Sequence, residues 1–113
     1  MSTLLIALPI PPGGAEKIEA FFGEVKAKLH DHTKSRTAIG CTQEVCAIQA
    51  MPDGGKLFIL CLGGEDPVKA NQLFAESRSA YDRWFKNSAG TIMNASFDQP
   101  LPPISKTVFD WHA

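Results

Sequence analysis

The sequence predicts a single α+β domain of the ferredoxin-like βαββαβ type, a four-stranded antiparallel sheet with helices on one face. The first observation is the order of the predicted elements, which is strand, helix, strand, strand, helix, strand. The second is residues 56–62, which are apolar after the first position, as is typical of a strand buried on both faces. Because 113 residues support one core and not two, residues 1–113 are interpreted as one domain.

Residues 3–9 are predicted to form the first strand, and apolar side chains on both of its faces favour a central place in the sheet. An amphipathic helix is predicted over residues 15–32. Apolar side chains recur there at helical spacing, at Ile18, Phe21, Phe22, Val25 and Leu29. The polar residues 31–37 fit a frayed helix end, a second short helix or a loop equally well.

Residues 41–51 and 56–62 are predicted to form two strands joined by a tight Pro-Asp-Gly-Gly turn at residues 52–55. On the first of these strands, Glu44 shares a face with Cys46 and Ile48. A carboxylate beside apolar side chains must reach solvent or find a partner. Glu44 is therefore the acidic residue of greatest interest in the chain.

The second helical region carries two start signals. Asp66 is predicted to be an N-cap with Pro67 at the first helical position. Ser79 and Asp82 resemble a capping box, which predicts a further helical segment. Residues 87–90 are predicted to end that segment, and residues 91–97 are predicted to form the last strand.

The C-terminal tail, residues 98–113, combines three prolines with an apolar cluster at residues 108–112. The prolines Pro100, Pro102 and Pro103 do not suit a regular element. The apolar cluster is expected to dock, either on its own domain or across a dimer interface. A homodimer is expected on independent grounds, because helices on one side of the sheet leave the other face bare, and isologous contact with a second copy buries it.

Composition excludes several classes of partner. Eleven Lys and Arg against twelve Asp and Glu, a net charge of −1, disfavour nucleic acid and anionic membranes. Residues 4–10 are too short to span a bilayer and residues 1–3 lack the charge of a signal peptide, so we expect a cytoplasmic protein.

The three cysteines lack C-x-x-C spacing and are expected to be free thiols. No metal or cofactor site is predicted, because His30 and His32 diverge on a helix and are expected to be solvated at its end.

Several segments together resemble a known family: the order of elements, the turn at residues 52–55, the segment Ser-Ala-Tyr-Asp-Arg-Trp-Phe-Lys at residues 79–86, and the ending Val-Phe-Asp-Trp-His-Ala. In these the chain is similar, over nearly its whole length, to small uncharacterised bacterial proteins of the dimeric α/β-barrel superfamily. The resemblance implies a ferredoxin-like subunit and a homodimer through sheet faces. It implies no single activity, because that superfamily includes cofactor-free oxygenases, haem-degrading enzymes, cyclases, isomerases and stress-related proteins. Relatives are expected to carry a histidine where this chain has Met93, which disfavours histidine chemistry here.

Two functions are compatible with these features. In the first, the chain is a homodimeric small-molecule-binding or stress-related module without catalysis. In the alternative, it is a cofactor-independent monooxygenase, cyclase or isomerase acting on a hydrophobic small molecule between sheet and helices. Glu44 or Asp82 would then move a proton. The residues expected to contact the ligand are Arg36, Tyr81, Arg83, Trp84 and Asn94. An enclosed Glu44 with a raised pKa favours the enzyme, and a paired Glu44 favours the module.

Overall fold

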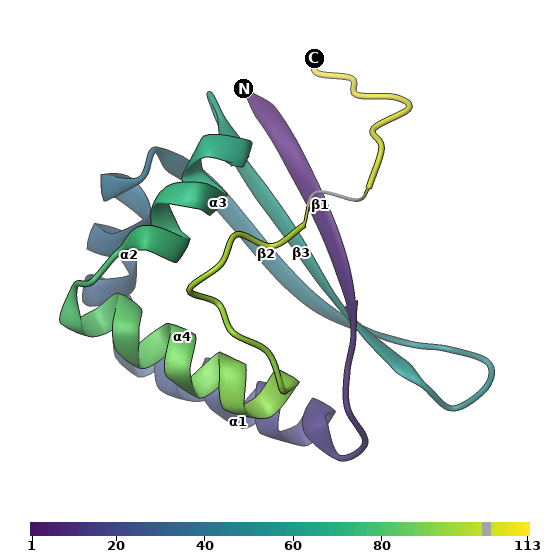
Figure 1. Ribbon diagram of the computed structural model, residues 1–113. Helices are drawn as coiled ribbons and strands as arrows, with labels where there is room; N and C mark the ends of the chain where they lie inside the picture. The colour runs from purple at the N-terminus through teal and green to yellow at the C-terminus, as the bar shows by residue number, and fades with distance from the viewer. Residues whose placement is uncertain (103–104) are drawn as a thin grey trace.

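The computed structural model describes residues 1–102 and 105–113. It has the α+β composition that the sequence predicts, with three strands and four helices in the described residues (Figure 1). In chain order the elements are β1 (Ser2–Pro9), α1 (Gly14–Ala27), α2 (Leu29–Ala38), β2 (Cys41–Ala50), β3 (Lys56–Gly64), α3 (Pro67–Glu76) and α4 (Ala80–Met93).

The sheet has the order β1-β3-β2, and β3 is antiparallel to both neighbours. The predicted hairpin is confirmed, since β2 and β3 pair directly and Ala50 lies opposite Lys56. In the connecting turn, Gly54 has φ of 89° and the Asp53 carboxylate accepts a hydrogen bond from the Gly55 amide. The central position of β3 explains why its sequence is apolar on both faces.

The predicted fourth strand at residues 91–97 is wrong. Helix α4 continues to Met93, and Asn94 ends it in the left-handed conformation with φ of 52°. Gly90, interpreted above as part of a helix exit, lies inside the helix. The Ala95 amide donates to the Gly90 carbonyl, and a Cβ on Gly90 would lie 2.5 Å from the Ala95 carbonyl oxygen. The glycine therefore permits the chain to fold back over the helix.

Without a fourth strand the sheet of the described residues has three strands, so the ferredoxin-like arrangement is incomplete. Strand β1, expected in the centre, lies at an edge and pairs only with β3 among the strands described. The helices all lie on one side of this sheet (Figure 1). Helix α2 packs on β2, helix α3 on β1 and β3, and α4 on α1 and α2.

The region predicted as one helix over residues 15–32 forms two helices, which meet at Lys28. The polar residues 31–37, left undecided by the sequence, belong to α2. Both predicted helix starts are confirmed. The Asp66 side chain accepts from the Lys69 amide at 3.0 Å, and Ser79 Oγ accepts from the Asp82 amide at 3.3 Å.

Two clusters form the core. One lies on the helix-facing side of the sheet and the other between α1 and α4, where Phe21, Val25 and Phe85 meet. The buried residues of the sheet cluster are Leu4, Ile6, Cys41, Leu60 and Leu62. On the opposite face, Leu5 and Val45 remain 46% and 49% exposed, and no element of the described residues covers that face.

Only the first part of the tail docks on this chain. Leu101 packs against the sheet cluster, and Ser105 Oγ donates to the Leu5 carbonyl at the β1 edge. Val108, Phe109 and Trp111 are largely exposed, so the expected docking of residues 108–112 does not occur within this chain. Pro103 lies outside the described residues. Among those described, no helix has both the length and the apolar run needed to cross a membrane.

Candidate functional site

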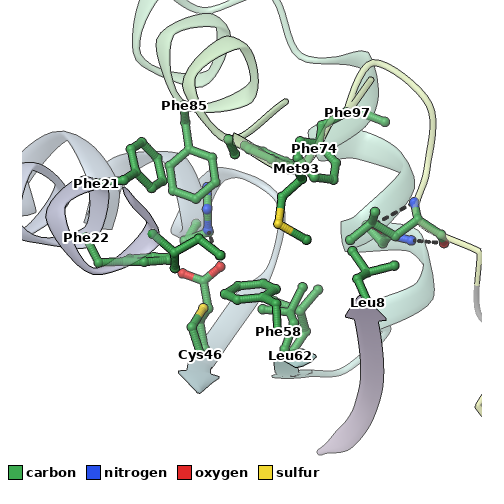
Figure 2. A pocket seen from close by; sticks show the side chains of 18 of the residues that line it. Leu8, Phe21, Phe22, Cys46, Phe58, Leu62, Phe74, Phe85, Met93 and Phe97 are labelled. Carbon is green, nitrogen blue, oxygen red and sulfur yellow. Dashed lines mark hydrogen bonds and ion pairs between the residues drawn. The ribbon is translucent and has the colours of Figure 1, made fainter. Parts of the chain in front are cut away.

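A cavity of about 80 Å³ lies between the sheet and the helices (Figure 2). Its wall is mostly apolar and comes from every layer of the fold, including β1, β3, α1, α3, α4 and the start of the tail. The labelled side chains around it are Leu8, Phe21, Phe22, Cys46, Phe58, Leu62, Phe74, Phe85, Met93 and Phe97. An apolar interior with few polar groups is the usual character of a small-molecule site.

Glu44 reaches this cavity because of its place on β2. Alternation along the strand puts Glu44, Cys46 and Ile48 on the helix-facing side of the sheet. The Glu44 carboxylate lies 2.6 Å from His32 Nε2, and Tyr81 OH lies 2.7 Å from His32 Nδ1. Since an ionised carboxylate only accepts, Nε2 donates to Glu44, while Nδ1 is hydrogen-bonded to the Tyr81 hydroxyl.

Arg36 is the second charged group on the cavity wall. Its Nε donates to Glu44 Oε2 at 3.1 Å and one terminal nitrogen donates to Ser35 Oγ at 2.9 Å. The guanidinium carbon lies 4.4 Å from the ring centroid of Phe74 and 4.7 Å from that of Phe85, and the two centroids are 5.6 Å apart, so the cation packs against an adjacent pair of aromatic rings. Its side chain is only 9% exposed.

Asp82 extends the network toward the start of α4. Its two carboxylate oxygens accept from the hydroxyls of Ser35 and Ser77, the latter at 2.5 Å. Arg36 lies 4.0 Å away and adds a weaker attraction. These side chains form one hydrogen-bonded network that joins α2, β2, the end of α3 and α4. Its members are His32, Ser35, Arg36, Glu44, Ser77, Tyr81 and Asp82.

The pKa values of both acids are lowered. Burial by itself raises the pKa of Glu44, but the hydrogen bond from His32 and the charge of Arg36 outweigh it, and the pKa falls below the ordinary 4.5. Burial also raises the pKa of Asp82, and the hydroxyls of Ser35 and Ser77 outweigh it, so this pKa falls below 3.8. Both groups are therefore ionised at neutral pH.

For two neutral groups burial is the largest influence, and it outweighs the opposing charge of Arg36. It raises the pKa of the Cys46 thiol to about 12 and that of the Tyr81 hydroxyl to about 12. Cys46 lines the cavity but holds its proton, so it is a poor nucleophile. The three cysteines are free, as the sequence predicts.

The structure brings together four of the residues singled out from the sequence: Arg36, Glu44, Tyr81 and Asp82. Trp84 packs in the helical layer, where its ring centroid lies 5.3 Å from Phe21 and 5.5 Å from Tyr81. Arg83 is exposed.

Asn94 also lies apart from this group, because it ends α4 roughly 20 Å along the helix from Tyr81.

Sequence reasoning missed His32 and the serines. The expectation of a solvated His32 is wrong, since Glu44 and Tyr81 hold it in a half-buried position, whereas His30 is exposed as expected. One signal was available. His32 and Arg36 are four apart and share a face once residues 29–38 are recognised as a helix. Ser35 and Ser77 carry no such signal, because only the tertiary fold brings them to Asp82.

The described residues contain no group of three His, Cys, Asp or Glu side chains arranged to hold a metal ion. Comparison with family models, with curated proteins and with solved structures gives no match for this chain. The fold and the site define an α+β protein with an apolar internal cavity whose polar edge is a buried, internally paired charge network. Its function is therefore argued from this geometry alone.

Proposed function

We propose that this chain is a cytoplasmic, homodimeric module that binds a small apolar molecule in the cavity and performs no chemistry on it. One observation carries the proposal: the cavity is walled by apolar side chains, and the charged groups on its wall, Arg36 and Glu44, already pair with each other. Apolar walls supply affinity for a ligand. Because Arg36 and Glu44 pair with each other, they hold their positions at the edge of the cavity.

The state of the ionisable groups argues against the enzymatic alternative. A general acid or base works best with a pKa near the operating pH, whereas Glu44 and Asp82 have lowered pKa values. The cavity wall, as far as the described residues define it, includes neither His32 nor Tyr81. His32 is moreover held at both ring nitrogens, so it has no free position for a substrate.

The size of the cavity limits the ligand. An engineered apolar cavity of about 150 Å³ binds benzene or xenon, and the present volume is about 80 Å³. A ligand of a few heavy atoms fits without rearrangement. Met93 borders the cavity, and its unbranched, adaptable side chain can yield to a somewhat larger molecule.

The homodimer is supported by the bare face of the sheet. Leu5 and Val45 both lie opposite Cys61, and the three side chains form a row across that face. Ala7, Ile59 and Ala47 form the next row. A second copy placed on this face by two-fold symmetry would bury the same rows on both subunits. A stable interface of this kind buries roughly 800 Å² on each partner.

The test is a titration with cyclopropane, a small hydrocarbon without a polar group, followed by methyl NMR. We expect saturable shifts at Leu8, Leu60 and Leu62, which line the cavity. Leu5 and Val45, on the bare face, are the internal controls and should not shift. Absence of saturable shifts at the cavity methyls would contradict the proposal.

A filled cavity provides the matched variant. Ala89 lines the cavity from α4, so Ala89→Leu should place extra methyl groups in the empty space and abolish cyclopropane binding. The cost in stability is expected to be about 1–3 kcal/mol at most, because the added volume enters existing space. Unchanged binding by A89L would place the hydrocarbon elsewhere.

A further inference from the structure

We infer that the natural occupant of the cavity is a small apolar molecule whose single polar group donates a hydrogen bond, an amine or an alcohol, and that carboxylic acids are rejected. This inference rests on the proposed function and adds the chemical class of the ligand. It follows from three observations. Glu44 has free acceptor sites, two carboxylates in its network share one arginine, and Arg36 already pairs with Glu44.

The Glu44 carboxylate can accept more hydrogen bonds than the two it receives from His32 and Arg36. An ionised carboxylate offers roughly four lone-pair sites. One oxygen accepts from His32 and the other from Arg36, so each retains a site. The side chain lines the cavity, and a donor group entering there finds an acceptor that is already ionised and held in place at both oxygens.

The network contains two carboxylates, Glu44 and Asp82, that share one arginine, Arg36. Glu44 is the carboxylate on the cavity wall. A ligand carboxylate beside Glu44 would add a like charge in a poorly solvated space, where repulsion is stronger than in water. A hydroxyl group meets no such repulsion, and an ammonium group is attracted by Glu44 while the neighbouring Arg36 opposes part of that attraction.

The positive group on the wall, Arg36, already pairs with Glu44. It donates from Nε to Glu44 and from a terminal nitrogen to Ser35. Its guanidinium also packs against the adjacent rings of Phe74 and Phe85. At the other side of the cavity, the Asn71 side-chain amide is occupied by both backbone groups of Leu101. Glu44, by contrast, keeps free lone-pair sites on both carboxylate oxygens.

The experiment compares three ligands that share a propyl tail: n-propylamine, 1-propanol and butyrate. Dissociation constants are measured near neutral pH from the chemical-shift changes of the methyl groups that line the cavity. Cyclopropane, which has no polar group, is the reference ligand. We expect propylamine and propanol to bind at least about tenfold more tightly than butyrate, a difference of 1.4 kcal/mol. A smaller difference, or tighter binding of butyrate, overturns the inference.

The variant Glu44→Gln keeps the size of the side chain and removes its charge. In E44Q we expect the preference for propylamine over butyrate to shrink to less than about threefold. Persistence of the full preference would overturn the assignment to Glu44. Because E44Q leaves Arg36 without its ion-pair partner and can fail to fold, a second readout uses the unaltered protein. The carboxyl ¹³C resonance of Glu44 should shift with propylamine and propanol and stay in place with cyclopropane. No shift with either donor overturns the inference.

These outcomes separate the inference from the function on which it depends. Binding of cyclopropane without discrimination among the three head groups overturns the ligand class and leaves the binding module standing. Failure of all four compounds to bind overturns both.

Discussion

His32 on α2 and Glu44 on β2 are joined by a hydrogen bond of 2.6 Å between Nε2 and the carboxylate. The other ring nitrogen of His32 is hydrogen-bonded to the Tyr81 hydroxyl on α4. One imidazole on α2 therefore connects β2 to α4. The polar edge of the cavity is part of the same structure, so the stability of the fold and the properties of the site depend on the same side chains.

Replacing Glu44 should therefore be costly. Glu44→Ala removes the acceptor of both His32 and Arg36 and leaves the buried Arg36 with the more distant Asp82, at 4.0 Å, as its carboxylate partner. We expect the free energy of unfolding to fall by about 3–5 kcal/mol, measured by urea denaturation. The control is Glu65→Ala at an exposed position, expected to change stability by about 0.5 kcal/mol or less. Equal effects of the two variants would show that Glu44 is not part of a buried network in solution.

The lowered pKa values predict how stability depends on pH. Glu44 and Asp82 are lowered from 4.5 and 3.8, so the unfolded chain binds protons at these groups more readily than the folded one. Their contribution is complete above about pH 5 and is lost as pH falls through the folded pKa values. Urea midpoints measured from about pH 7 to about pH 3 should decline in that acid range.

The matched variant for this pH dependence is Asp82→Asn, which removes one of the two lowered groups. Its urea midpoint should fall less steeply with acid than that of the unaltered protein. An acid profile as steep as before would show that Asp82 does not titrate with a lowered pKa.

The strap, defined as residues 97–101, should be held in place chiefly by Asn71. The Asn71 side-chain amide donates to the Leu101 carbonyl at 2.9 Å and accepts from the Leu101 amide at 3.4 Å. We expect Asn71→Ala to lower stability by about 1–3 kcal/mol and to speed hydrogen exchange at the Leu101 amide. Asn87→Ala, at an exposed position of α4, is the control and should leave that exchange rate unchanged. Unaltered exchange in N71A would show that other contacts hold the strap.

A second contact on the same strap involves Lys86. This side chain is 2% exposed and its ammonium lies 3.0 Å from Asp98 while donating to the carbonyls of Ala75 and Ser77. Its presence is the reason that N71A is expected to loosen the strap at Leu101 without releasing it completely.

The bare face of the sheet predicts self-association. We expect the protein to sediment as a dimer, and Val45→Lys to shift it toward monomer, because the new charge would enter the buried face. Val68→Lys is the control, since Val68 is similarly exposed but lies on α3, on the helical side. A monomeric parent protein, or a V45K variant that stays dimeric, would contradict the sheet-to-sheet interface.

The parts of this fold that the sequence predicts correctly are those set by local chemistry. The Pro-Asp-Gly-Gly turn fixes the β2–β3 hairpin, and Asp66 and Ser79 place two helix starts, because each signal acts within a few residues. Such features need no knowledge of distant contacts.

The errors arise where local signals conflict or are absent. The run from Thr91 to Phe97 suits a strand by composition, but Ile92 and Met93 also continue the inner side of α4, and tertiary packing selects the helix. Gly90 is used for close approach of Ala95 and not to end the helix. The sequence indicates that Glu44 must reach solvent or find a partner. That the partner is His32 depends on how α2 packs on β2, which sequence spacing does not show.

The central claim is that the space between sheet and helices receives an apolar ligand, and a crystal structure under xenon pressure tests it most directly. Xenon binds apolar cavities without needing any polar contact. The account predicts a xenon atom among Phe58, Leu60 and Phe85, with the Arg36–Glu44 pair intact beside it. An interior filled by its own side chains, with no xenon at that position, would contradict the account.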